Sequence, residues 1–314
     1  MINSTESITQ QYTLNPTSNL INGIPDNILA LIAPVIAYWI YSLIFHIIDT
    51  FELAENYRIH PSEEELQRNK ASRFDVLKDV IIQHIIQSIV GYIFVKYDNT
   101  NTDNELLPNF FNSSIQLIPI KLIPILLNYL IPFIKISIAF FFIDTWQYSL
   151  HKLMHMNKFL YKHFHSRHHR LYVPYAYGAL YNDPLEGFCL DTLGTGLAAL
   201  ITSLTPREQI ILYTFSTLKT VDDHCGYSLP FDPFQKIFPN NSIYHDIHHQ
   251  QWGIKTNFSQ PFFTFWDQIF NTRFKELDDN DGLNSKITLD KYHQYLLKRE
   301  ENKSLKKANK KLIE

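Results

Sequence analysis

The chain has 314 residues, of which 45% are hydrophobic and 19% charged, and its formal net charge at pH 7 is −3. Length alone would fit one or two soluble domains, but the hydrophobic residues are concentrated in long runs, which indicates a membrane protein. The only two cysteines, Cys189 and Cys225, exclude a metal site built on several thiolates. With this charge balance we expect no nucleic-acid partner.

The first half of the chain contains three candidate membrane segments. Residues 28–48 are uncharged and long enough to cross a bilayer as one helix, and the run is too long for the core of a signal peptide. Residues 80–95 form a shorter run whose polar side chains share one helical face, so that face should point inward. Residues 115–150 contain three prolines, so we expect a kinked or divided segment.

A fourth apolar region consists of two pieces, 187–203 and 207–221, separated by Thr205-Pro206. Because histidine-rich stretches flank both ends, the two pieces should return to the same side, as a helical hairpin or as a re-entrant unit. The sequence leaves open whether this region spans the membrane or only dips into it.

Basic residues predict the orientation of the chain. The segment 51–79 contains five lysines and arginines, whereas residues 1–27 and 98–114 contain none. Lysine and arginine accumulate in loops on the cytosolic side. We therefore expect residues 1–27 to face the lumen and the histidine-rich region to face the cytosol.

Nine of the fourteen histidines fall into four short stretches between residues 151 and 249. In a helix, residues three and four apart share a face, so each multi-histidine stretch should present one row of imidazoles. One catalytic metal takes about three protein ligands, so this many histidines favours two metal ions. The predicted ligands are His151, His155, His165, His168, His169, His224, His245, His248 and His249.

The residues around the histidines exclude some types of metal site. Imidazole ligands suit iron, zinc, copper or nickel. A zinc-protease pattern would need a glutamate directly after the first histidine, where Lys152 stands, and no stretch contains the glutamates of a ferritin-like site. An almost all-histidine dinuclear centre remains, which suits iron that activates dioxygen. We expect no catalytic residue separate from the metal ligands.

Further residues are candidates for supporting roles. Carboxylates commonly orient the imidazoles that bind a metal, and the candidates here are Asp144, Asp222, Asp223 and Asp246. His163, two residues before His165, should point to another face and either support the metal ligands or have a structural role. Four aromatic residues are expected either to line a slot for a long chain or to mark the membrane interface: Tyr172, Tyr175, Tyr177 and Phe258.

The order and spacing of the histidine stretches resemble the fatty acid hydroxylase superfamily, which includes sterol desaturases and sterol methyl oxidases. Longer phrases are similar to fungal-type sphingolipid C-4 hydroxylases, among them Asp144-Thr-Trp-Gln-Tyr-Ser-Leu-His-Lys-Leu-Met-His155 and Tyr244-His-Asp-Ile-His-His-Gln-Gln251. The similarity covers roughly residues 140–275 strongly and the rest loosely.

The resemblance implies an enzyme of the endoplasmic reticulum that inserts one oxygen atom at C-4 of sphinganine or dihydroceramide and gives phytosphingosine-type products. It also implies two iron ions, dioxygen, and electrons from NAD(P)H through a reductase and cytochrome b5. No fused cytochrome domain is evident, so we expect the cytochrome to be a separate partner. An unactivated methylene has no acidic proton and no leaving group, so a metal–oxygen oxidant fits this reaction.

Other functions fit the same scaffold. Sterol desaturation, sterol methyl oxidation and fatty acid 2-hydroxylation would use the same histidines, because pocket shape decides the substrate. A non-catalytic metal-binding membrane scaffold is the alternative outside the enzymes. The sequence does not distinguish the free base from the ceramide, and it does not fix the metal or the oligomeric state.

We therefore predict an all-α, multi-pass membrane protein with a cytosol-facing helical di-metal domain. Its regions are a lumenal tail at 1–27, a transmembrane region at 28–135, the di-iron domain at 136–275 and a basic tail at 276–314. From residue 286 onward the tail has nine basic and four acidic residues. This composition fits a solvated helix or a contact with anionic lipid.

Overall fold

The computed structural model describes residues 18–97, 119–277 and 287–313. Among these residues there is no β-strand, only two isolated bridges, and nearly all regular structure is helical, which confirms the all-α prediction. Most of the predicted lumenal tail at 1–27, the 98–114 loop and part of the 276–314 tail lie outside the described residues.

Within residues 18–97, 119–277 and 287–313, three helices are long and apolar enough to cross a membrane: α2 (Asp26–Thr50), α4 (Arg73–Tyr97) and the segment Ile123–Met156. Large apolar side chains cover their outer faces, for example Ile40 on α2, Ile89 on α4 and Phe133 at the start of the third helix. Exposure of so many apolar groups would be unfavourable in water and is favourable in lipid. The structure therefore confirms the three predicted membrane segments.

The third segment is divided, as its prolines predict. It consists of α6 (Ile123–Ile125), the π-helical turn η4 (Leu126–Leu130) and α7 (Ile131–Met156). Pro124 and Pro132 lie at the starts of α6 and α7. Because η4 directly precedes α7, the missing N–H group of Pro132 leaves a carbonyl of the preceding turn without a helical donor. One long, interrupted helix thus carries the first histidines at its end.

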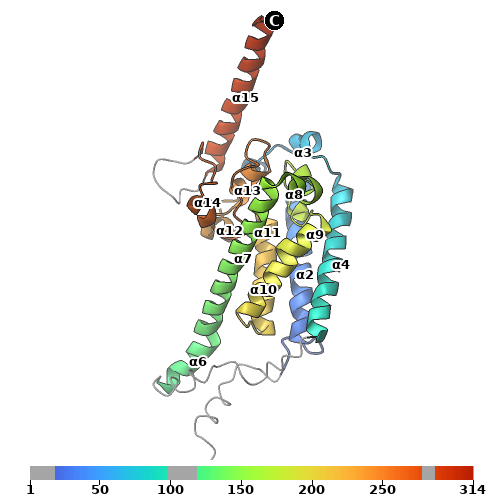
Figure 1. Cartoon of the computed structure of the whole chain (residues 1–314), viewed down its shortest axis with the longest axis vertical. Coiled ribbons are helices and arrows are strands. Elements are labelled where there is room, and N and C mark those ends of the chain that lie inside the picture. The colour runs from blue at the N-terminus through green and yellow to red at the C-terminus, as the bar shows by residue number, and fades with distance from the viewer. Residues whose placement is uncertain (1–17, 98–118, 278–286, 314) are drawn as a thin grey trace, which may run out of the picture.

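The fourth apolar region is a helical hairpin. Its first arm consists of α9 (Pro184–Gly187), the π-helical turn η8 (Phe188–Thr192) and α10 (Leu193–Ile201), and its second arm is α11 (Pro206–Asp223). Thr205 and Glu208 form a capping box that starts α11. The hairpin packs between α7 and α2 (Figure 1).

Helices α2 and α4 share a buried hydrophobic cluster with the histidine-bearing region. Tyr38 and Phe45 of α2 and Val80 of α4 pack with Tyr181 and Val221 in a single buried cluster. Of the polar residues expected to face inward on α4, Gln83 and His84 are buried and Gln87 is half-buried, but Ser88 is exposed, so the prediction holds only in part. Gly187 allows this packing, because an added Cβ atom would lie 2.2 Å from the Gln83 amide nitrogen.

Short helices close one end of this bundle (Figure 1). They are η1 (Glu55–Tyr57), α3 (Ser62–Arg68), α8 (Lys158–Leu160), η5 (Tyr161–His165), η6 (His168–Arg170), η7 (Ala176–Gly178), α12 (Pro233–Ile237), α13 (Ser242–His249) and α14 (Phe265–Ile269). The remaining elements are η3 (Ile120–Leu122), before the third membrane segment, and α15 (Leu289–Ile313), which projects away from the bundle (Figure 1).

The basic segment after α2 lies at the same end as the histidines. The Lys70 N–H group donates to the Arg170 carbonyl at 2.8 Å, and the Ser228 N–H group donates to the Tyr57 carbonyl at 2.8 Å. These contacts agree with the prediction that 51–79 and the histidine region face the same side of the membrane.

Candidate metal centre

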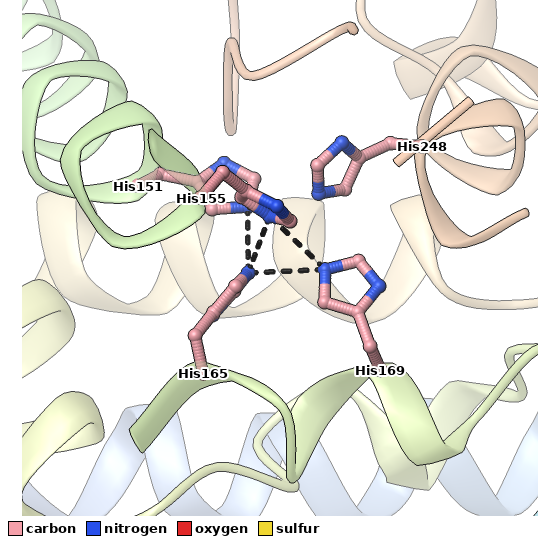
Figure 2. Close-up of side chains that lie close together, drawn as sticks. All are labelled: His151, His155, His165, His169 and His248. Atoms are coloured by element: carbon pink, nitrogen blue, oxygen red, sulfur yellow. Dashed lines mark hydrogen bonds between the residues drawn. The ribbon is translucent and has the colours of Figure 1, made fainter. Parts of the chain in front are cut away.

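Nine histidines lie buried together at this end of the bundle, in two groups. The first group consists of His151, His155, His165, His169 and His248, and the second of His168, His224, His245 and His249. Within each group the ring nitrogens that face inward lie within 4.8 Å of one another. Figure 2 shows the five rings of the first group converging from several elements.

The structure divides the histidine stretches differently from the sequence-based expectation. His245 and His249 of α13 belong to the second group, but His248 belongs to the first. The expectation of one row for each stretch is therefore wrong. Adjacent residues on a helix, such as His248 and His249, differ in direction by about 100°. Because α13 lies between the two groups, it supplies histidines to both.

In each ring, the hydrogen bond made by the nitrogen that faces away from the group determines whether the nitrogen that faces inward can bind a metal. Five rings place Nδ1 against a backbone carbonyl: His151 at Phe258 (2.8 Å), His168 at Tyr181 (3.3 Å), His224 at Thr220 (2.8 Å), His248 at Thr256 (2.7 Å) and His249 at Leu171 (2.8 Å). A carbonyl can only accept, so in each ring Nδ1 carries the proton and Nε2 presents a lone pair.

These lone pairs face one another at short range. The Nε2 atoms of His168 and His224 lie 3.4 Å apart, and neither can donate to the other. In the first group the Nε2 atoms of His165 and His169 lie 3.0 Å apart. Ligands about 2.1 Å from a metal and at right angles would be roughly 3 Å apart. The donor set and its spacing therefore fit metal ions.

Burial keeps the rings neutral, which metal binding requires. It lowers the pKa of His165, His168 and His224 to about 3, because a charged ring would lose its hydration there. Nine neutral imidazoles bring no negative charge, so two divalent ions would carry an uncompensated positive charge. The buried carboxylates around the histidines, including Asp144, Glu186 and Asp267, can balance that charge.

The predicted supporting carboxylates act through the backbone or through other side chains. Asp144 accepts the N–H groups of Phe262 (3.0 Å) and Phe263 (2.7 Å), and so holds the loop whose Phe258 carbonyl orients His151. None of the described contacts joins Asp144 directly to an imidazole of either group. Its part is to position the loop.

The other predicted supporting residues lie in separate networks. Asp246 contacts Nε2 of His60 at 2.9 Å and accepts the hydroxyl of Tyr292 at 2.6 Å. Asp223 pairs with the buried Lys219, and Asp222 accepts from Gln235 at 3.3 Å. His163 is exposed, and its ring packs on Phe159, with 4.6 Å between the ring centroids. In the described structure none of these four residues hydrogen-bonds a grouped histidine.

Among the described residues, the carboxylate that does contact a grouped histidine is Glu186, which no sequence pattern had indicated. Its Oε1 atom contacts Nδ1 of His165, and its side chain is fully buried. Burial raises the pKa of Glu186 to about 8, and a metal ion held by His165 would oppose that shift. Asp183 and Pro184 mark the start of α9, but pairing across 21 residues could not be read from local spacing.

A cavity borders both groups. Its lining comprises Gln147, His165, His168, Ala179, Asn182, Glu186, Leu190, Asp191, Thr220, Asp223, His224, His245, Gln260 and Pro261. The four aromatic residues expected to line a slot are absent from this lining.

Those four aromatic residues lie outside the cavity lining, in other packed positions. Phe258 is buried against the rings of the first group, 5.2 Å from the His155 centroid. Tyr175 and Tyr177 pack on each other, 4.6 Å between centroids, and Tyr175 belongs to the core cluster. Tyr172 lies beneath the Lys70 amino group. Aromatic content alone did not distinguish core positions from cavity positions.

Comparisons with known proteins agree with this centre. The fatty acid hydroxylase family model matches residues 136–272. The chain is 57% identical to a sphingolipid C4-hydroxylase of Saccharomyces cerevisiae, over 94% of this chain and 86% of that protein. It is 43% identical to sphinganine C4-monooxygenase 1 of Arabidopsis thaliana, over 80% and 88% of the two chains.

A third relative, the sphingolipid C4-hydroxylase of Schizosaccharomyces pombe, is 44% identical over 78% of this chain and 87% of its own length. No solved structure matches the chain. The identities and the coverage extend through the membrane helices as well as the histidine region. The chain therefore belongs to the fatty acid hydroxylase family, within its group of sphingolipid C4-hydroxylases.

Proposed function

We propose that this chain hydroxylates C-4 of a sphingoid base, sphinganine or dihydroceramide, and gives phytosphingosine-type sphingolipids. The nine grouped histidines, buried where three apolar helices end, are the observation that carries the proposal. The names of its relatives point to the same carbon and the same substrate class.

The reaction inserts one oxygen atom into a C–H bond. In balance, R–H, dioxygen, two electrons and two protons give R–OH and water. Two iron ions, held one in each histidine group, would supply an oxidant strong enough to cleave an unactivated C–H bond. The nine histidines are the proposed ligands, and the proposed di-iron domain is 136–275.

The surrounding residues orient the imidazoles, exclude water and leave a path for the lipid substrate. Backbone carbonyls orient the imidazoles, and Asp144 fixes the loop that carries one of those carbonyls. Burial excludes water from the rings, which protects a reactive centre from side reactions. Since α7 brings His151 and His155 to the end of a membrane helix, a lipid substrate can approach from the bilayer.

Electrons would come from NAD(P)H through a reductase and a separate cytochrome b5-type donor. Basic residues near the histidines offer a surface for an acidic donor: Lys152, Lys158, Lys162, Arg167 and Arg170. We place the enzyme in the endoplasmic reticulum membrane with this end in the cytosol, as the basic residues of 51–79 support.

The test is lipid mass spectrometry on cells that lack sphingoid C-4 hydroxylation and express the chain. We expect 4-hydroxylated long-chain bases with the wild type and with His163→Ala, whose ring is exposed, and none with His168→Ala. If sterols or 2-hydroxy acyl chains change while the long-chain bases do not, C-4 hydroxylation is refuted. The chain would then catalyse one of the alternative reactions. No lipid change, with protein present and metal bound, would refute an oxidative role and favour a metal-binding scaffold.

A further inference from the structure

Helix α13 supplies histidines to both groups, so its position affects both metal sites. It carries His248 of the first group and His245 and His249 of the second. A helix of eight residues is not stable by itself in water, so contacts with the rest of the chain must hold it in place. The residues that make these contacts therefore influence the geometry of both sites.

Asp246 of α13 receives two such contacts from segments that are distant in the sequence. The hydroxyl group of Tyr292, in α15, donates to Oδ2 of Asp246 at 2.6 Å. Nε2 of His60 lies 2.9 Å from the same oxygen. All three side chains are buried. A buried carboxylate is unfavourable without hydrogen-bond partners, so these contacts favour one position of Asp246 and of the helix that carries it.

Apolar contacts between α13 and α15 support the same arrangement. Tyr292 packs with Ile243 and Ile247 of α13 in one buried cluster. One turn further along α15, the ring of Tyr295 packs on Trp252, with 5.2 Å between the ring centroids. The first part of α15 is therefore packed against the histidine-bearing region, although the rest of this helix projects away from the bundle (Figure 1).

We propose that Tyr292 is a positioning residue for the metal centre: by holding Asp246 it fixes α13, and with it ligands of both histidine groups. Helix α15 begins at Leu289, after the residues 136–272 that the family model matches, and His60 precedes them. The metal centre thus depends on segments on both sides of the matched domain. The inference rests on the proposed function only in taking the nine histidines as metal ligands, and it does not depend on the lipid substrate.

The test compares wild type with Tyr292→Phe, which removes one hydroxyl group and keeps the ring. Tyr295→Phe is the matched control, because the Tyr295 hydroxyl group donates to the exposed Glu276 at 2.8 Å. The purified full-length protein is loaded with cobalt(II), whose visible absorption spectrum responds to the geometry of its ligands. We expect the chelator concentration that removes half of the cobalt to fall roughly tenfold in Tyr292→Phe, the lower end of the range for residues that orient ligands. The cobalt spectrum should change in Tyr292→Phe and stay unchanged in Tyr295→Phe.

A double-mutant cycle decides whether Tyr292 acts through Asp246. Asp246→Asn replaces the charged acceptor by a neutral amide, so Tyr292→Phe should reduce cobalt retention much less in this background than in wild type. Equal reductions in the two backgrounds would overturn the inference. If Asp246→Asn does not accumulate, His60→Gln takes its place in the cycle, because His60 contacts the same oxygen.

Two other outcomes have distinct meanings. A lower melting temperature of Tyr292→Phe with unchanged cobalt retention and spectrum would make Tyr292 a structural residue only, and would overturn the inference. These readouts need no lipid, so failure of the proposed function would look different. A wild type that binds cobalt in both groups but, loaded with iron, hydroxylates no lipid would refute the proposed reaction, and the cobalt measurements would still decide the role of Tyr292.

Discussion

Replacement of Glu186 tests the histidine centre through a residue that is not itself a metal ligand. Leucine at this position removes the carboxylate that contacts Nδ1 of His165 and keeps a side chain of similar size. A hydrogen bond to a charged group contributes about 1.5–3 kcal/mol, and each 1.4 kcal/mol is a factor of ten in an equilibrium constant. We therefore expect metal affinity to fall by roughly 10–100-fold in Glu186→Leu, the range typical of residues that orient ligands.

The assay is retained metal per chain after dialysis against graded chelator, without lipid substrate. Glu186→Gln keeps an acceptor and should lose less affinity than Glu186→Leu. Glu208→Gln is the control, because Glu208 is a similarly buried carboxylate at the far end of the hairpin, paired with Lys135 at 2.6 Å. If Glu186→Leu retained metal as well as Glu208→Gln does, the orienting role of Glu186 would be refuted.

Two further predictions concern stability. Asp144→Ala leaves the buried N–H group of Phe262 and the N–H group of Phe263 without their acceptor, so we expect a loss of about 2–6 kcal/mol, seen as a lower melting temperature in detergent; an unchanged melting temperature would contradict this. Burial opposes the charged form of His60, but Asp246 and Glu64 raise its pKa to about 9. Protonation thus stabilises the fold fully below the ordinary value near 6.5, and the contribution, at most about 3 kcal/mol, is lost as pH rises from there through 9. His60→Gln should reduce the pH dependence of the free energy of unfolding between about pH 6.5 and 9. An unaltered pH dependence would show that the interaction of His60 with Asp246 and Glu64 does not stabilise the fold.

The sequence was sufficient for features that depend on neighbours along one helix or on length. The apolar runs predicted three membrane helices, and the prolines predicted the division of the third, because both effects act within a few residues. The four-residue spacing of His151 with His155, and of His245 with His249, placed each pair in one group.

Features that depend on which elements face each other could not be predicted in this way. His168 and His248 join groups different from those of their nearest histidine neighbours, because the segments that carry them pass between the two groups. Glu186 reaches His165 through the packing of α9, and Asp191 enters the cavity from a π-helical turn. Tyr175 was expected near substrate but packs in the core, where an aromatic ring is equally favourable.

Repeating the expression experiment under ¹⁸O₂ tests directly whether this chain inserts an oxygen atom from dioxygen at C-4. We expect 4-hydroxylated long-chain bases that contain one ¹⁸O atom at C-4, formed by the wild type and His163→Ala and absent with His168→Ala. A C-4 hydroxyl without the label would show that the oxygen comes from water, and a desaturated base without the hydroxyl would show a different oxidation. Either result would contradict the assignment of this chain as a sphingoid C-4 monooxygenase.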